Sequence, residues 1–110
     1  MENPNLDVVV REHLETARRS DSGRAAETVY GGHEKTLRQT VIAMTAGTEL
    51  HEHESPGEAT VLVLQGAVRL RTGDTTEEGR GGDLLVIPPD RHSLEAVEDS
   101  AVLLTVAKLS

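Results

Sequence analysis

Residues 47–59 have the sequence GTELHEHESPGEA, and this stretch decides more about the 110-residue chain than any other. Side chains alternate between the two faces of an extended segment, so His51 and His53 can point to the same side. Two imidazoles that converge in this way can form half of a metal site, although two ligands do not complete one. The simpler interpretation is two polar residues on the solvent-facing side of a strand.

Short segments with the pattern of strands surround this stretch. β-branched and apolar runs bounded by turn residues predict strands over 36–46, 60–64, 68–71, 84–87 and 101–107. The four residues Thr72–Thr75 predict a hairpin turn. Because 60–64 is apolar on both faces, we expect that strand to be covered on both sides. The series of short strands predicts an all-β sandwich or barrel.

The N-terminal segment has a different period. Apolar and histidine side chains recur there at three- and four-residue spacing, at Leu6, Val9, Val10, His13, Leu14 and Ala17. This stripe predicts a helix, capped by Asn3 or Asn5 and ended by 20–23. We therefore divide the chain into a helix with a connecting arm, 1–35, and a barrel, 36–110. One helix cannot bury its stripe alone, so it should pack on the barrel or on a second subunit.

The composition excludes several classes of function. A net charge of -8 and a single aromatic residue, Tyr30, argue against nucleic-acid and anionic membrane partners. The absence of cysteine excludes disulfides, thiol nucleophiles and thiolate metal sites. The sequence shows no pattern of a secretory signal and no run of about 20 apolar residues. We expect a cytoplasmic protein with no nucleic-acid or membrane partner.

Residues 47–59, taken with GDLLVIPPDRH at 82–92, resemble the two conserved motifs of the cupin superfamily. Gly66, which follows an apolar strand, agrees with that pattern, and the resemblance covers about residues 36–107. It implies a small jelly-roll β-barrel with the helix as an N-terminal addition. It also implies a divalent metal inside the barrel, which the family usually holds with three histidines and one glutamate. Its members have many different activities, so the resemblance says little about the reaction.

The resemblance can be aligned in two registers. The ungapped register, anchored on Gly47 and Gly66, makes His53 the first histidine of the motif. In that register Ser55 and Ala59 occupy the positions of the second histidine and the glutamate, so two ligands would be missing.

The other register satisfies the ligand chemistry but spaces the glycines less regularly. It takes His51 and His53 as the pair and Glu58 as the carboxylate. In the second motif the usual spacing puts the third histidine at Ser93, and a one-residue deletion would make His92 that ligand; the alternative is a surface histidine. The resulting candidate metal ligands are His51, His53 and His92, with Glu58 as a weaker fourth. They would hold a divalent transition metal such as Zn, Fe, Ni, Mn or Cu.

Two functions remain open on the sequence. The first is a metal-dependent enzyme that acts on a small organic molecule. The second is a metal-free, non-catalytic cupin that binds a small molecule, as a sensor would. The aromatic deficit predicts an open, aliphatic cup for a small or aliphatic ligand. In either case we expect a homodimer, because the apolar outer face of 60–64 needs a cover.

Overall fold

The computed structural model describes residues 3–53 and 57–108, without the side chains of Glu52 and His53. In chain order these residues form α1 (Leu6–Arg19), β1 (Arg24–Tyr30), β2 (Leu37–Met44), β3 (Glu49–His53), β4 (Gly57–Gln65), β5 (Ala67–Thr72), β6 (Thr75–Arg80), β7 (Leu84–Ile87), β8 (His92–Ala96) and β9 (Ser100–Lys108). The predicted all-β class with one N-terminal helix is confirmed.

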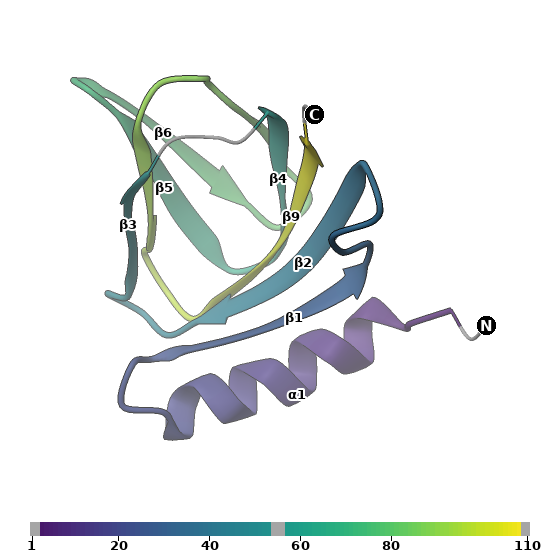
Figure 1. Ribbon diagram of the computed structural model, residues 1–110. Coiled ribbons are helices and arrows are strands. Elements are labelled where there is room, and N and C mark those ends of the chain that lie inside the picture. Colours follow the sequence, from purple (N-terminus) through teal and green to yellow (C-terminus); the bar gives the residue numbers. More distant parts are fainter. Residues whose placement is uncertain (1–2, 54–56, 109–110) are drawn as a thin grey trace.

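The strands form two antiparallel sheets that face each other (Figure 1). The five-stranded sheet has the order β1-β2-β9-β4-β7, and the four-stranded sheet has the order β3-β8-β5-β6. Strands that are neighbours in a sheet are often distant in the sequence, since β9 lies between β2 and β4. The Thr72–Thr75 turn is confirmed, because β5 ends at Thr72 and β6 begins at Thr75.

The space between the sheets is filled by aliphatic side chains. Along β4, Ala59, Val61 and Val63 point inward, and Leu62 and Leu64 pack on the opposite side. The inner core consists of Met44, Ala59, Val61, Val63, Val68, Leu70, Leu85, Ile87, Leu94, Ala96, Val102 and Val106. Burying such side chains contributes about 1.5–3 kcal/mol for each of the larger ones. The strand at 60–64 is therefore covered on its inner face, as its sequence predicts. Its outer leucines pack against the cluster under α1, so this face does not by itself require the second subunit that the sequence suggests.

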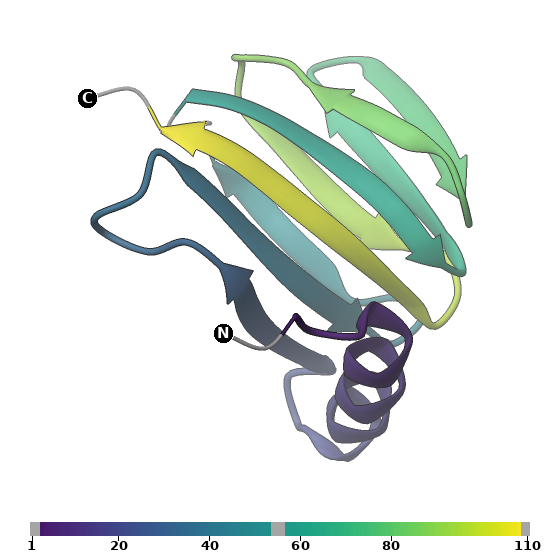
Figure 2. The same cartoon turned by 90° about the vertical axis from the view of Figure 1, so that its right-hand side faces the viewer.

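The helix α1 packs on the outer face of the five-stranded sheet, against β1, β2 and β9 (Figure 2). It buries Val9, Val10, Leu14 and Ala17, and the Asn5 side chain caps its first turn by accepting a hydrogen bond from the N–H of Val8 at 3.1 Å. Both features follow the predicted stripe and cap. No helix in the described part of the chain is long and apolar enough to cross a membrane.

Besides the inner strand β8, two strands lie where the sequence predicts none. The segment 24–30, which the sequence places in a connecting arm, forms β1 and pairs with β2 along most of its length. The segment 75–80 forms β6 and pairs with β5. Both are edge strands with mostly exposed side chains, so neither shows the apolar pattern of a buried strand.

One end of the barrel, which we call the Ser100 end, is organised around a buried serine. The hydroxyl of Ser100 accepts a hydrogen bond from the N–H of Ala67 at 3.0 Å and lies 2.7 Å from the carbonyl oxygen of Glu98. Gly66 precedes Ala67 with a φ of 88°, and a Cβ at this position would overlap the carbonyl oxygen of Asp99 and the hydroxyl of Ser100. The turn therefore requires glycine for both its conformation and its close packing.

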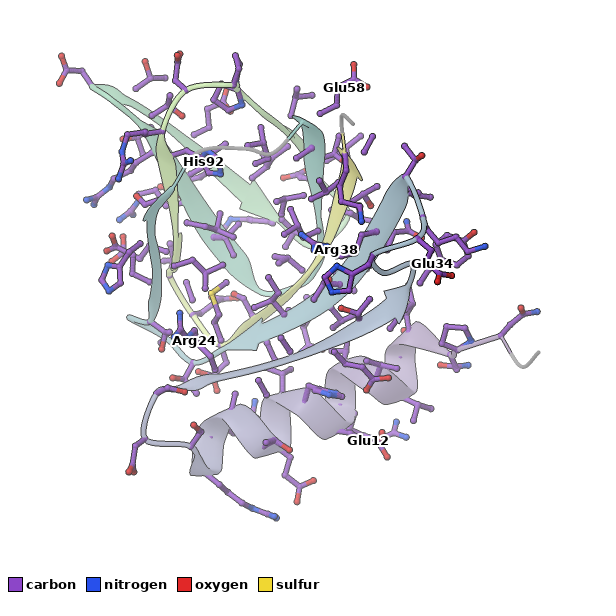
Figure 3. All side chains as sticks on the ribbon, in the orientation of Figure 1. Glu12, Arg24, Glu34, Arg38, Glu58 and His92 are labelled. Atoms are coloured by element: carbon purple, nitrogen blue, oxygen red, sulfur yellow. The ribbon has the colours of Figure 1, made fainter. Side chains whose placement is uncertain are left out.

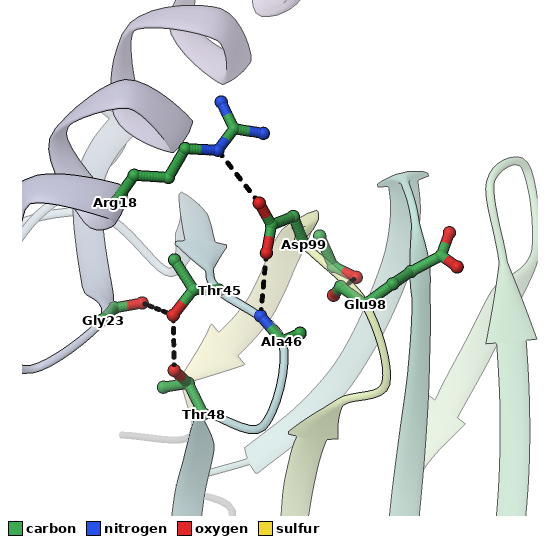
Figure 4. Close-up of polar contacts among 8 residues, drawn as sticks. Arg18, Gly23, Thr45, Ala46, Thr48, Glu98 and Asp99 are labelled. Atoms are coloured by element: carbon green, nitrogen blue, oxygen red, sulfur yellow. Dashed lines mark hydrogen bonds and ion pairs between the residues drawn. The ribbon is translucent and has the colours of Figure 1, made fainter.

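Asp99 connects this end of the barrel to the helix (Figure 4). Its carboxylate accepts hydrogen bonds from the N–H of Ala46 and from Nε of Arg18, each at 2.9 Å. The hydrogen bond from Ala46 and then the contact with Arg18 lower the pKa of the Asp99 carboxyl. Because Arg18 lies in the last turn of α1, the pair fixes the helix C-terminus against the barrel.

Candidate binding site in the barrel interior

Near the opposite end, which we call the His92 end, the inner core contains a small cavity. Its volume is about 30 Å³, enough for one or two water molecules. It is lined by Ile42, Leu50, Val61, Leu70, Ile87, His92, Leu94, Val102 and Leu104. The lining is aliphatic apart from one imidazole, as the aromatic deficit predicts, but the cavity is not the open cup that the deficit also predicts. The cavity is narrow because leucine, isoleucine and valine occupy much of the barrel interior.

His92 is the polar residue in this lining. It begins β8 and is buried, and the strand alternation that carries it inward also directs Leu94 inward. Its Nδ1 lies 3.0 Å from the carbonyl oxygen of Asp90. A carbonyl only accepts, so Nδ1 carries the hydrogen, and in the neutral ring Nε2 is then an acceptor. The structure therefore places one hydrogen-bonding imidazole in an otherwise apolar wall.

The histidines of the first motif are separated by a β-bulge. His51 is exposed, because Leu50 is the residue of β3 that points into the cavity. The expectation that strand alternation directs His51 inward therefore does not hold. The β3–β8 ladder shifts register between Leu50 and His53, so that the backbone of His53 lies opposite His92. The side chain of His53 and all of Ser55 lie outside the described residues.

The two positions considered for the glutamate ligand lie on opposite faces of β4. Ala59 points inward and belongs to the inner core, whereas Glu58 is exposed. Figure 3 shows Glu58 directed away from the barrel interior, while His92 lies within it. Gly47 and Gly66 both adopt left-handed φ values, of 86° and 88°, and the inward position of Ala59 agrees with the ungapped register. In that register Ala59 stands at the glutamate position.

These observations test whether the chain fits the metal set that the resemblance implies. Within residues 3–53 and 57–108, no group of three or more histidine, cysteine, aspartate or glutamate side chains could hold a metal ion. Of the four predicted ligands, His92 is inside, and His51 and Glu58 are exposed. The described side chains therefore do not fit a site of three histidines and one glutamate.

Arg38 belongs to the same end of the barrel, although the sequence does not single it out. It lies near the start of β2. Across the five-stranded sheet, Arg38 pairs with Val106 of β9, Val106 pairs with Ala59 of β4, and Ala59 pairs with Ile87 of β7. These four residues form one row across the inner face of the five-stranded sheet. The signal in the sequence is the alternation of Arg38 with Thr40 and Ile42 along one strand, which puts all three on one face.

No known family model matches the chain, and no curated protein does. The structure is similar to that of a conserved protein of unknown function from Streptococcus pyogenes, at 29% identity and a TM-score of 0.74, covering 83% of this chain and 79% of that one. An RmlC-like cupin protein from Desulfovibrio desulfuricans is 30% identical, with a TM-score of 0.67, covering 76% of this chain and 81% of that one. A cupin superfamily protein from Desulfitobacterium hafniense is 16% identical with a TM-score of 0.72, covering 78% of each chain, and this is a likeness of fold alone.

Proposed function

The chain belongs to the cupin superfamily, and from this premise we propose that it binds a small organic molecule inside its barrel without a metal ion. The observation that carries the proposal is the aliphatic cavity with the single buried imidazole of His92 in its wall. Apolar surroundings and a few placed polar groups are the usual chemistry of a small-molecule site.

The size of the cavity limits what the ligand can be. A space of about 30 Å³ accepts only a few carbon atoms, so the rest of a larger ligand must lie at the His92 end. The buried carbons are favoured by about 0.8 kcal/mol for each methylene group removed from water. A hydrogen bond to His92 contributes about 1 kcal/mol more and orients the ligand.

Calorimetric titration with short aliphatic alcohols, amides and acids tests this proposal. We expect His92→Leu to weaken binding about fivefold, the equivalent of one hydrogen bond, and His33→Leu, in an exposed loop, to leave it unchanged. Binding should persist in the presence of a chelator. A wild-type protein that binds none of these compounds, or binds them only with added metal, would overturn the proposal.

One observation supports a second candidate, a transition-metal site formed by His53 and His92. The two residues are partners in the β3–β8 ladder, so their Cα atoms lie opposite each other. This function predicts one equivalent of Zn²⁺ or Ni²⁺ bound per chain, measured by elemental analysis. Binding should be lost in both His53→Ala and His92→Ala and retained in His51→Ala, because His51 is exposed. Metal content well under one equivalent after reconstitution would rule it out.

A homodimer is the assembly that we propose for either function. Leu84 and Val86, on the edge strand β7, are 59% and 70% exposed, although both are large aliphatic side chains. An exposed apolar edge strand is a surface that proteins normally cover. We expect Val86→Lys to shift the protein from dimer to monomer in light scattering at micromolar concentration, and Val97→Lys, at the Ser100 end, to leave the dimer intact. A monomeric wild-type protein would contradict this.

A further inference from the structure

We propose that the ligand is a carboxylic acid, with Arg38 binding its carboxylate at the His92 end and its aliphatic chain entering the cavity. The inference rests on the proposed function, because it names the chemical class of the molecule that the barrel takes.

Arg38 is on the wall that leads into the cavity. It shares the inner face of β2 with Thr40 and Ile42, and Ile42 lines the cavity. Ile42 lies four residue steps along β2 from Arg38, which is about 13 Å along the wall. Figure 3 shows Arg38 and His92 on facing walls of the barrel. A molecule that reaches from the cavity towards the His92 end therefore passes along the strand that carries Arg38.

Among the described residues the guanidinium of Arg38 has no polar partner, whereas a comparable arginine contacts two carboxylates. Arg38 and Arg69 are the half-buried arginines in the described part of the chain. Arg69 contacts two carboxylates, Glu95 at 3.4 Å and Glu78 at 3.5 Å. The Arg38 side chain forms no hydrogen bond or ion pair within residues 3–53 and 57–108. A partly desolvated guanidinium favours a planar, bidentate anion, and a carboxylate has that shape.

The neighbouring charge adds to this preference. Lys108 ends β9 beside the start of β2, and its Nζ donates a hydrogen bond to the carbonyl oxygen of Gly32. Its backbone N–H bonds to the carbonyl oxygen of Thr36, two residues from Arg38. Lys108 therefore adds a second positive charge at this end of the five-stranded sheet, in a chain whose net charge is -8. Positive side chains at this end favour the approach of an anion.

A comparison of hexanoate with hexanamide measures the contribution of the carboxylate to binding separately from that of the aliphatic chain. Both have the same chain length, and only hexanoate is an anion at neutral pH. By calorimetry at low salt we expect hexanoate to bind wild type at least tenfold more tightly than hexanamide does. In Arg38→Gln this preference should disappear through weaker hexanoate binding, with hexanamide binding unchanged. Arg38→Lys should retain part of the preference, since it keeps the charge and loses the bidentate geometry.

Arg24→Gln is the matched control. Arg24 is exposed and pairs with Met44, at the Ser100 end of the same sheet, so its substitution should leave the preference for hexanoate intact. Thermal melting of each variant establishes that it is folded. Equal binding of the two compounds to wild type, or an unchanged preference in folded Arg38→Gln, would refute carboxylate binding by Arg38. Neither result would contradict the proposed small-molecule site inside the barrel. Failure of both compounds to bind wild type overturns the proposed function as well.

Discussion

At the Ser100 end of the barrel the buried polar groups are paired within the chain, whereas at the His92 end Arg38 has no protein partner among the described residues. Ser100 is fully buried and satisfies the backbone of Ala67. Asp99 connects the barrel to α1 through Arg18. Groups that are fully paired stabilise the fold, and groups without a partner are available to a ligand. This difference is what we expect if the Ser100 end maintains the structure and the His92 end binds the proposed ligand.

The largest effect that tests this comparison is expected from Gly66→Ala. The residue has a φ of 88°, and a Cβ would come within 2.8 Å of the Cα of Ser100. We expect the free energy of unfolding to fall by about 2–4 kcal/mol in urea denaturation, from strain and overpacking together. Gly73→Ala is the control, since φ there is 58° and nothing lies within 4 Å of a Cβ, and it should cost about 1 kcal/mol. If the two variants lost the same unfolding free energy, close packing at Gly66 would not explain the effect.

Ser100→Ala should have the next largest effect. It leaves the buried N–H of Ala67 without its acceptor, and such a group costs about 1–3 kcal/mol. Chemical denaturation measures the loss, with the exposed Ser22→Ala expected to stay within about 0.5 kcal/mol of wild type. If the two substitutions proved equivalent, the Ser100 end would not be the stabilising end.

Asp99 gives a smaller effect that depends on pH. Because folding lowers the pKa of its carboxyl, its contribution is fully present above the unfolded pKa of about 4 and is lost as the pH falls through the folded value. The gap in unfolding free energy between wild type and Asp99→Asn should therefore be widest above about pH 5 and close under more acidic conditions. It should be modest, since the Asp99 side chain is 37% exposed. A gap that does not change with pH would contradict the assignment.

The smallest effect on stability is expected at the His92 end. Arg38→Met removes no protein partner among the described residues, so the unfolding free energy should change by less than about 0.5 kcal/mol. Arg69→Met, which removes contacts with Glu78 and Glu95, should lower it by up to about 1 kcal/mol. Thermal or urea unfolding compares the two variants directly. A larger loss in Arg38→Met would make Arg38 structural and weaken its assignment to a ligand.

The parts of the fold that the sequence predicts well are those with strong local signals. The apolar stripe and the cap at Asn5 predict α1, and glycine with polar neighbours predicts the Thr72–Thr75 turn. The edge strands β1 and β6 lack such signals. In β6 the buried residue is Gly79, which leaves room for the side chains of Leu85 and Val63 and therefore shows no apolar alternation.

The site is harder to predict because it depends on how strands pair. His51 and Leu50 are adjacent and only one can face inward, and burying the leucine is favoured over burying an imidazole. The β-bulge that follows shifts the register of the β3–β8 pairing before His53, and no local sequence pattern predicts this shift. Arg38 has an inward-facing position that alternation along β2 does predict, but a charged side chain there is easily assigned to solvent.

The position of β9 has a consequence for the order in which the protein can form. It is the last strand in the described chain, and it lies in the middle of the five-stranded sheet, hydrogen-bonded to β2 and β4. During synthesis nothing joins β2 to β4 until residues 100–108 leave the ribosome. The nascent chain therefore exposes two apolar strand edges at once, and its folding depends on contacts between distant segments, which are slow to form. We expect a chain interrupted before Ser100 to need a chaperone.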